Sequence, residues 1–350
     1  MRLSSVLVAL SSLAASSVAA HKEPSTPQEV AEHVARQETI YHCLPKIREQ
    51  VAARKAARRG LGAVPNVAEQ QLYLGDAFSS GDETMPTELS CVKDQETARM
   101  RNHTCVLTPV VTQGPYYHDR GHPIRQNMAE DQLGLPFAID VGVIDVNTCE
   151  PLEGVLVDIW HANATGHYAG HPHQEEALKW EGPAHEGPRK GLLSKYPRTK
   201  PDETFLRAAW PTNKEGISQF TSIFPGYYTG RATHVHCKVF TEWEPHVNGT
   251  YTGGNLIHTG QFFVDDSINQ QVDKMWPYVN NPIANKWGRT RNWDDSLSIY
   301  QTSHQNGFGP TLDIEFVGGV IQQGLVSFIT IGVNSSASYP PTQAWSPITN

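Results

Sequence analysis

The sequence has no excess of positive charge, since 36 acidic residues outnumber 28 lysines and arginines and leave a net charge of −8. Nucleic acids are held largely by basic side chains, so this balance disfavours them as partners. Beyond the first twenty residues, no apolar run approaches the roughly 20 residues that span a bilayer. Internal repeats and the glycine fingerprints of nicotinamide or flavin cofactors are also missing. The sequence therefore disfavours nucleic-acid-binding, membrane-spanning and nucleotide-cofactor proteins.

What the sequence does contain is typical of a folded protein rich in short strands. Its 350 residues are 39% hydrophobic, which is enough for a core and excludes disorder as the main state. The 28 glycines, the 24 prolines and the 9% of aromatic residues favour strands and tight turns over long helices.

The first twenty residues have the pattern of a secretory signal peptide. Arg2 supplies one positive charge, a short apolar stretch follows, and small residues lead to Ala20, after which we expect cleavage. A membrane anchor is the alternative, but the apolar stretch is too short to span a bilayer. We therefore expect a secreted, extracellular protein.

Five cysteines remain after that cleavage, and an odd number leaves at least one thiol without an intramolecular partner. They are Cys43, Cys91, Cys105, Cys149 and Cys237. Export permits disulfides, but the sequence leaves their pairing open. We expect Cys237 to be the free cysteine, because it lies in a strand-like run among residues of the candidate site. Four Asn-x-Ser/Thr sequons agree with a secreted glycoprotein, and they begin at Asn102, Asn163, Asn248 and Asn334.

Two segments near the N-terminus have helical composition. They are residues 29–38 and 46–59. Gly60 follows the second segment, as expected at the C-terminus of a helix. Residues 21–90 are therefore expected to form a helical N-terminal extension and a possible pro-region. The basic pair Arg58-Arg59 could be a processing site, although charged runs on helices are more often solvated faces.

From about residue 105 the pattern changes to short β-branched and aromatic runs bounded by Gly, Pro, Asn and Asp. The expected strands are 137–146, 155–161, 218–224, 234–240, 256–264, 311–317 and 326–333. They predict a mainly β chain, in which residues 91–350 form an antiparallel β-sandwich core with long inserted loops. The polar stretch 165–205 is rich in Gly, Pro and His, and we expect it to be a loop that borders a site.

The most informative segment runs from Phe224 to His236. On a strand, His234 and His236 project from the same face, which is how two imidazoles reach one metal ion. A His-x-His pair alone is weak support for a metal site. Tyr228 and Arg231 just upstream strengthen it, and so does a second turn-type segment, Gly-Pro-Tyr-Tyr at 114–117.

At these residues the sequence resembles the intradiol ring-cleavage dioxygenases, which include catechol 1,2-dioxygenases and protocatechuate 3,4-dioxygenases. It is most similar to their secreted fungal branch. In that family one tyrosine ligand closes a Gly-Pro-x-Tyr turn, which here selects Tyr117. The second tyrosine follows a Pro-Gly-x-Tyr turn and precedes an Arg-x-x-His-x-His run. The matching residues are Tyr228, Arg231, His234 and His236.

Two further segments fit the same resemblance, which covers roughly residues 105–270. Gln261 matches a glutamine on the strand that follows the histidines. Residues 157–163 are similar to the family's first core strand and to the loop after it on the substrate side.

The resemblance implies a non-haem Fe(III) centre. Its metal ligands would be Tyr117, Tyr228, His234 and His236. A hard, acidic ferric ion favours anionic oxygen together with imidazole nitrogen, so this donor set suits it. Binding requires deprotonated phenols, whose usual pKa is about 10, and leaves part of the coordination sphere open, as a catalytic metal needs.

The resemblance also implies the reaction, which is cleavage of a catechol-type ring by O2 between its two hydroxylated carbons. The product would be a diacid of the cis,cis-muconate type. Tyr228 would accept a substrate proton, Arg231 would stabilise charge on the ring, and Gln261 would donate a neutral hydrogen bond near the same carbon. The N-terminal segment does not look like the dimerisation helices of cytoplasmic members, so we expect a monomer or a weak dimer.

Several alternatives stay open at the level of the sequence. In each tyrosine doublet the ligand could be Tyr116 or Tyr227, although turn spacing favours Tyr117 and Tyr228. A histidine group could hold zinc in a metal-dependent esterase, and its members are His161, His167, His171, His173 and His185. The strand carboxylates Asp140, Asp145 and Asp158 could imitate a glycosidase pair. A hypothesis of another class is a secreted sandwich that binds aromatic or carbohydrate polymers and carries a vestigial metal site.

Overall fold

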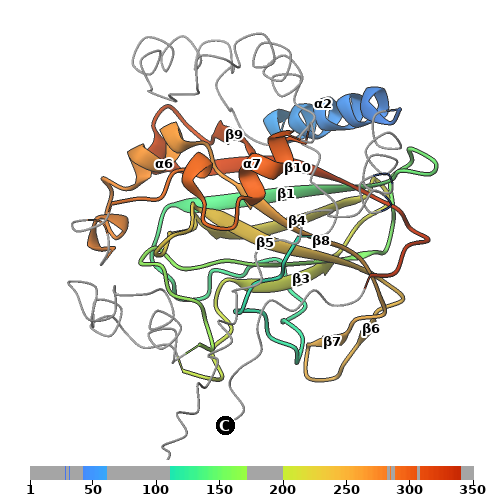
Figure 1. The fold of residues 1–350 in the computed structure, drawn as a ribbon, viewed down its shortest axis with the longest axis horizontal. Helices are drawn as coiled ribbons and strands as arrows, with labels where there is room; N and C mark the ends of the chain where they lie inside the picture. Colours follow the sequence, from blue (N-terminus) through green and yellow to red (C-terminus); the bar gives the residue numbers. More distant parts are fainter. Residues whose placement is uncertain are drawn as a thin grey trace, which may run out of the picture.

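Two four-stranded sheets form the centre of the protein in the computed structural model (Figure 1). The structure describes residues 42–60, 111–171, 200–281, 288–305 and 308–339, together with residues 28, 31 and 284. The first sheet has the order β4-β1-β10-β9, with bounds Ile217–Ile223, Pro136–Asp145, Leu325–Val333 and Asp313–Phe316. The second has the order β3-β2-β5-β8, with bounds Arg207–Pro211, Leu156–Trp160, His234–Thr241 and Asn255–Phe263. A small hairpin pairs β6 (Glu244–Pro245) with β7 (Tyr251–Thr252).

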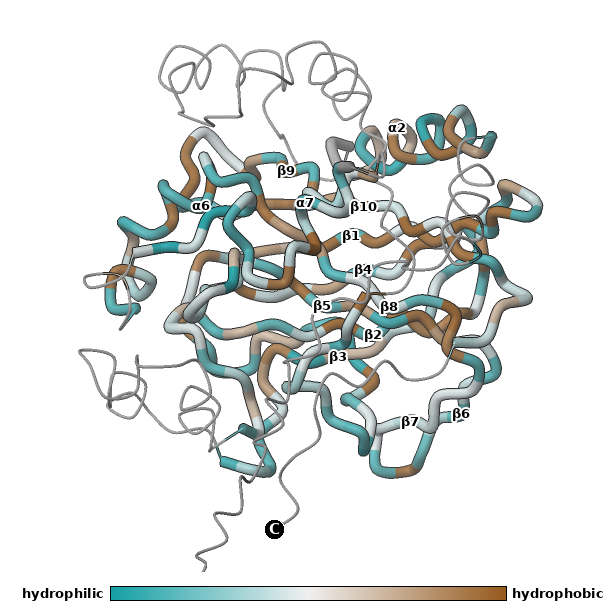
Figure 2. The backbone as a smooth tube through the Cα atoms, viewed as in Figure 1, coloured by the Kyte–Doolittle hydropathy of each residue, from teal (hydrophilic) through white to brown (hydrophobic). Residues whose placement is uncertain are grey.

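The hydrophobic core lies between the two sheets. Alternate residues of β1 and β10, such as Val141 and Ile329, pack in one cluster with Val157, Val235 and Val239 of the second sheet. This is the period of two expected for strands with one face in a core. Figure 2 shows hydrophobic residues concentrated in the strands and hydrophilic residues in the outer loops. The expected β-sandwich is therefore confirmed.

The pairing is antiparallel throughout the two sheets with one exception. β1 and β10 run parallel, with Phe137 opposite Leu325 and Asp145 opposite Val333. The sandwich is therefore antiparallel, as expected, apart from this one pair. Parallel strands need a long crossover connection, and here nearly the whole domain separates the two strands in sequence.

All seven expected strands are present, with ends that differ by at most a few residues. The sequence did not indicate β3 or the two-residue strands β6 and β7. β3 has the sequence Arg-Ala-Ala-Trp-Pro, which lacks the β-branched residues that mark the other strands. Its backbone is nevertheless fixed by pairing with β2, from Trp160 opposite Arg207 to Leu156 opposite Pro211.

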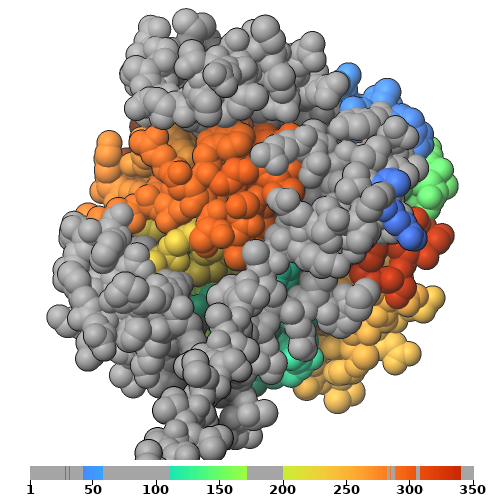
Figure 3. All heavy atoms as spheres, in the orientation of Figure 1, coloured from blue at the N-terminus to red at the C-terminus, as the bar shows by residue number. Residues whose placement is uncertain are grey.

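Short helices cover one side of the sandwich. They are α6 (Asp266–Val272), α7 (Ile299–Gln305) and the 3-10 turns η4 (Tyr278–Asn280), η5 (Asn292–Asp294) and η6 (Ile321–Gln323). Figure 3 shows the orange segment that carries α7 at the surface on this face of the molecule. No helix within the described ranges is long and apolar enough to cross a membrane.

The expected helix 46–59 is present as α2 (Leu44–Gly60), with Pro45 in its first turn, where proline is tolerated. A disulfide joins Cys43, next to this helix, to Cys149 after β1. Cys237 is free and buried, as expected. The signal peptide, the expected helix 29–38, Cys91 and Cys105 lie outside the described residues.

Two basic residues of α2 are buried against the first sheet, which corrects the expectation of a solvated charged face. Arg54 Nε donates to Asp140 Oδ1 at 2.6 Å, and its other nitrogens donate to Thr330 Oγ1 and to the carbonyls of Asp140 and Ile329. Lys55 pairs with Asp313 and lies 3.6 Å from Glu315. The helix therefore docks on the sandwich through desolvated ion pairs as well as apolar contacts.

The buried pair of Arg54 and Asp140 predicts a large loss of stability when one partner is removed. Arg54→Met leaves the Asp140 carboxylate uncompensated at 1% exposure, and we expect unfolding to become easier by about 3–5 kcal/mol. Lys46→Met, on the same helix, breaks only the exposed pair with Glu150 and should cost about 0–1 kcal/mol. Urea unfolding of both variants tests this, and equal losses would show that the buried pair does not dock the helix.

Candidate metal centre

One face of the second sheet carries polar residues, although it is buried. His234 and His236 alternate along β5 with Val235 and Cys237, which point into the core. In register with His236 lie Trp160 on β2 and Gln261 on β8. The sheet therefore presents the two histidines side by side on the face away from the core, as their spacing predicted.

The two imidazoles and a tyrosine hydroxyl converge at one point. His234 Nε2 and His236 Nε2 are 3.0 Å apart, and the hydroxyl of Tyr168 lies 3.3 Å from the first and 3.1 Å from the second. The ring of Tyr228 meets that of Tyr168 edge to face, with centroids 5.6 Å apart, and the two hydroxyls interact. Two phenol oxygens and two imidazole nitrogens therefore face one another in a buried site.

The structure does not place Tyr117 in this group. Its hydroxyl lies 3.2 Å from that of Tyr251 and 3.3 Å from Asp158 Oδ2. Its ring contacts Trp160, with centroids 4.9 Å apart, and Trp160 in turn stacks on His236 at 4.8 Å. Tyr117 is thus one ring removed from the histidines, and the phenol that lies beside them is that of Tyr168.

The loop that carries Tyr168 is built by its own side chains. Asn163 Oδ1 accepts hydrogen bonds from the backbone N–H groups of Thr165 and His167, each at 3.1 Å. Gly166 has a φ of +87°, and a Cβ there would overlap the carbonyl oxygen of Tyr227. The loop after β2 therefore fits closely against the turn that carries Tyr228, so the two phenols meet although 60 residues separate them.

The contacts of Tyr227 and Tyr116 show where the second tyrosine of each doublet lies. Tyr228 points into the site, whereas Tyr227 packs under the guanidinium of Arg289, whose Cζ is 4.2 Å from the ring centroid. Tyr116 stacks on Tyr168 with centroids 4.4 Å apart. The two neighbours are therefore wall aromatics, as expected.

Arg231 is held rigidly beside the site. Its Nε donates to both oxygens of Asp295, at 2.9 and 3.2 Å, and its other nitrogens donate to the Tyr228 hydroxyl at 3.3 Å and to Gln261 Oε1 at 2.5 Å. Burial alone would lower the pKa of Arg231, but Asp295 and Tyr228 raise it above its usual value. Gln261 Nε2 in turn donates to the carbonyl of Thr112 at 3.0 Å, which extends this series of hydrogen bonds.

Burial sets the protonation of the four donors. It raises the pKa of the Tyr168 phenol well above its usual value and raises that of Tyr228. It lowers the pKa of both imidazoles well below the usual value, with a further contribution from Arg231. The proton on His234 Nδ1 points to the carbonyl of Ala232 at 2.7 Å, which leaves a lone pair on Nε2. The site is thus a neutral set of oxygen and nitrogen donors, suited to a hard cation.

Comparison with known proteins identifies the fold. The structure is similar to that of an intradiol ring-cleavage dioxygenase from Tetranychus urticae, at 26% sequence identity and a TM-score of 0.50, over 67% of this chain and 98% of that chain. The chain has the fold of the intradiol ring-cleavage dioxygenases. The resemblance seen in the sequence is thereby confirmed, and an oxidoreductase of this ring-cleaving class is supported.

Other solved dioxygenases are similar at lower scores. A second dioxygenase matches at 26% identity and a TM-score of 0.49, with the same shares of both chains. Catechol 1,2-dioxygenase from Pseudomonas arvilla C-1 matches at 17% identity and a TM-score of 0.35, over 89% of this chain and 87% of that chain. No family model matches the sequence, and no curated protein does.

The alternative metal and catalytic groups do not assemble in the described part of this dioxygenase fold. Only one group of three or more His, Cys, Asp or Glu ligand atoms lies within 4.8 Å there, and it consists of His42 and the disulfide-bonded Cys43 and Cys149. His161 hydrogen-bonds to Ser222 and the carbonyl of Ala162 instead. His173 and His185 lie outside the described residues.

The carboxylates of the glycosidase alternative have separate structural partners. Asp140 pairs with Arg54, and Asp145 accepts from the backbone of Asn147 at 3.1 Å. Asp158 accepts from Tyr251 and His122. They therefore do not form a catalytic pair.

Three of the four sequons can be placed in the structure. Asn248 and Asn334 are exposed, whereas the amide of Asn163 donates to Gln132 Oε1 at 3.1 Å and organises the loop before Tyr168. Glycosylation at these sites stays a prediction. Asn102 lies outside the described residues.

The close fit between the Tyr168 loop and the Tyr228 turn predicts an unequal effect of two glycine substitutions. Gly154→Ala and Gly166→Ala both force alanine into a positive φ, which costs about 1–2 kcal/mol. Gly154 faces open space, whereas a Cβ at Gly166 meets Tyr227, so Gly166→Ala should lose about 1–3 kcal/mol more. Urea unfolding measures both, and equal losses would contradict the claimed contact.

Proposed function

We propose that the protein is a secreted, non-haem Fe(III) dioxygenase that cleaves catechol-type ortho-diphenols with O2 between the two hydroxylated carbons. The product would be a diacid of the cis,cis-muconate type. The observation that carries this proposal is the convergence of two imidazole nitrogens with two phenol oxygens, on the fold of the intradiol dioxygenases. The ligands would be Tyr168, Tyr228, His234 and His236, with Tyr168 in place of Tyr117.

The chemistry of the four donors fits a ferric ion. The imidazoles are neutral and offer lone pairs, and the phenols can ionise at neutral pH only if a cation compensates their burial. A bound ferric ion would supply Lewis acidity toward the catechol oxygens and withdraw electron density from the ring. Two phenolates and two imidazoles also leave room for substrate, as a catalytic metal site requires.

The protein's own groups would handle protons and charge. Tyr228 Oη would accept a proton from a substrate hydroxyl. Arg231 Nη1 is placed to donate a hydrogen bond to Tyr228 Oη. Negative charge that develops on the ring is stabilised by the fixed guanidinium, whose orientation toward the site is set by Asp295. Because the site is buried, these charge interactions are stronger than they would be in water.

Gln261 is hydrogen-bonded through both of its polar atoms. Oε1 accepts from Arg231, and one N–H of Nε2 donates to the carbonyl of Thr112. We therefore propose that Gln261 also positions Arg231, beside its expected role as a hydrogen-bond donor near the ring.

Secretion is proposed from the leader-like first twenty residues and from the disulfide between Cys43 and Cys149, since disulfides persist in oxidising compartments. A monomer or weak dimer stays part of the proposal. Iron, O2 and a small ortho-diphenol are the only partners it requires.

The ligand assignment predicts opposite results for two conservative substitutions. Tyr168→Phe removes one of the two phenol donors, so it should weaken and shift the tyrosinate-to-iron charge-transfer band and lower ring cleavage by at least about 100-fold. Tyr117→Phe removes a hydroxyl that lies outside the donor group, and it should keep both the colour and most of the activity. Iron content, the visible spectrum and O2 uptake with catechol give the three readouts.

The same experiment tests the function itself. Catechol added without oxygen should shift the visible band, and air should then restore the original spectrum as a muconate-type product forms. A protein that binds no iron and stays colourless would favour the polymer-binding hypothesis. A weakened and shifted band in Tyr117→Phe but not in Tyr168→Phe would restore the ligand set expected from the sequence.

A further inference from the structure

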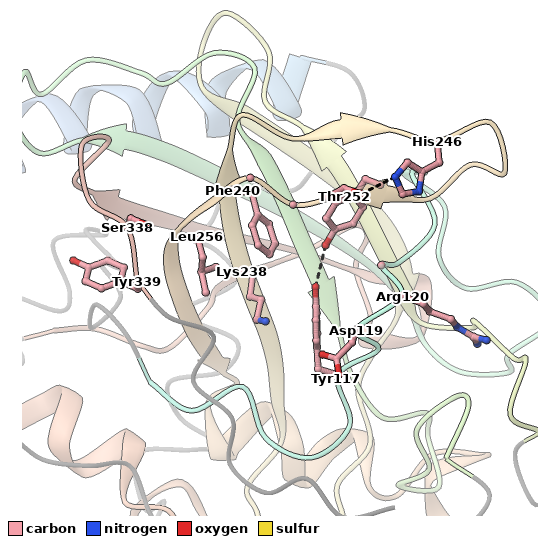
Figure 4. A pocket seen from close by; sticks show the side chains of 14 residues that line it. Tyr117, Asp119, Arg120, Lys238, Phe240, His246, Thr252, Leu256, Ser338 and Tyr339 are labelled. Atoms are coloured by element: carbon pink, nitrogen blue, oxygen red, sulfur yellow. Dashed lines mark hydrogen bonds between the residues drawn. The ribbon is translucent and has the colours of Figure 1, made fainter. Parts of the chain in front are cut away.

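A second polar site lies on the same sheet face, at the far side of Trp160 from the histidines. It is a pocket of about 450 Å³ that shares no residue with the four donors of the metal centre. Lys238, two positions beyond His236 on β5, projects into it beside Tyr117 (Figure 4). The Lys238 ammonium lies 3.6 Å from the centroid of the Tyr117 ring.

The ammonium of Lys238 has no hydrogen-bond acceptor and no ion pair among the described residues, although the side chain is only 2% exposed. A buried ammonium that contacts an aromatic ring but makes no ion pair is costly, which makes an incoming anion favourable at this position.

Asp158, which lies opposite Lys238 on β2, makes its hydrogen bonds to other groups. Asp158 accepts from Tyr251, from Tyr117 and from His122 Nδ1. Arg207, which is 1% exposed, donates to His122 Nε2 at 3.2 Å from the other side. Asp158 and Arg207 are therefore linked through His122, and Lys238 makes no ion pair with either residue.

The other residues that line the pocket indicate what kind of anion would fit it. Phe240, Leu256 and Tyr339 give it apolar walls, and the exposed Asp119 and Arg120 stand at its edge with opposite charges (Figure 4). A bare inorganic ion would leave these walls in contact with water. An apolar body attached to the anionic group would cover them.

We propose that this pocket binds a small organic carboxylate with an apolar body, whose carboxylate group pairs with the Lys238 ammonium. The site is separate from the metal centre and does not depend on the proposed reaction. It would be a second ligand site on the face of the sheet that carries the histidines.

Benzoate and its neutral analogue benzamide test this proposal by calorimetric titration of the full secreted protein. Benzoate should bind with a Kd on the order of 1 mM or tighter, and benzamide at least about tenfold more weakly. Lys238→Met should weaken benzoate at least about tenfold, whereas Lys238→Arg should restore most of the binding. Lys214→Met, at an exposed lysine between β3 and β4, is the matched control and should change nothing.

Two further measurements keep the result interpretable. Lys238→Met should melt no lower than the wild type, because an unpaired buried charge is replaced by an apolar side chain of similar length. His236→Ala, which disrupts the metal centre, should leave benzoate binding in place. Absence of benzoate binding, or binding that is lost in His236→Ala and kept in Lys238→Met, would overturn the proposal.

Discussion

The alternation of side chains along β5 is the constraint on which both sites depend. Val235, Cys237 and Val239 enter the core, and this fixes His234, His236 and Lys238 on the opposite face. A shift of one residue would move every one of these side chains to the other face, so the buried core protects the register. Pairing with β2 and β8 then brings Trp160 and Gln261 level with His236. The core packing of one strand thus determines where the chemistry can occur.

On that face, the structure separates two kinds of polar chemistry by one aromatic ring. On the His236 side of Trp160 lie neutral oxygen and nitrogen donors. On the Tyr117 side lies Lys238, which makes no ion pair with any described residue. Buried polar groups are costly unless they are satisfied, so each arrangement points to something that completes it. We propose a ferric ion and a catechol for the first, and a carboxylate for the second.

The sequence was sufficient to predict those site residues that lie close together along the chain. A strand, a turn and their spacing place Tyr228, Arg231, His234 and His236, and all four lie at the centre found in the structure. It did not indicate that Tyr168 lies nearer to the histidines than Tyr117, because the positions of two tyrosines on different loops depend on how far each loop reaches. The position of the Tyr168 loop is fixed by the contact of Gly166 with Tyr227. These two residues belong to segments far apart in the sequence, and no local pattern links them. A tyrosine five residues after Asn163 in the loop after β2 was the available signal.

The same limit applies to the fold. Strands with β-branched residues were found from their composition, whereas β3 is held by its pairing with β2 and has little signal of its own. The charged helix α2 resembled a solvated segment, since charge alone does not reveal a partner such as Asp140, 86 residues further along the chain. Buried ion pairs of this kind depend on tertiary structure and cannot be read from one segment.

The most direct test of the central claim is a crystal structure of the iron-loaded protein with anomalous scattering measured at the iron edge. The account predicts one anomalous peak within bonding distance of Tyr168 Oη, Tyr228 Oη, His234 Nε2 and His236 Nε2, and none at Tyr117. A peak bonded to Tyr117, or a protein loaded with iron that shows no peak beside the two histidines, would contradict it.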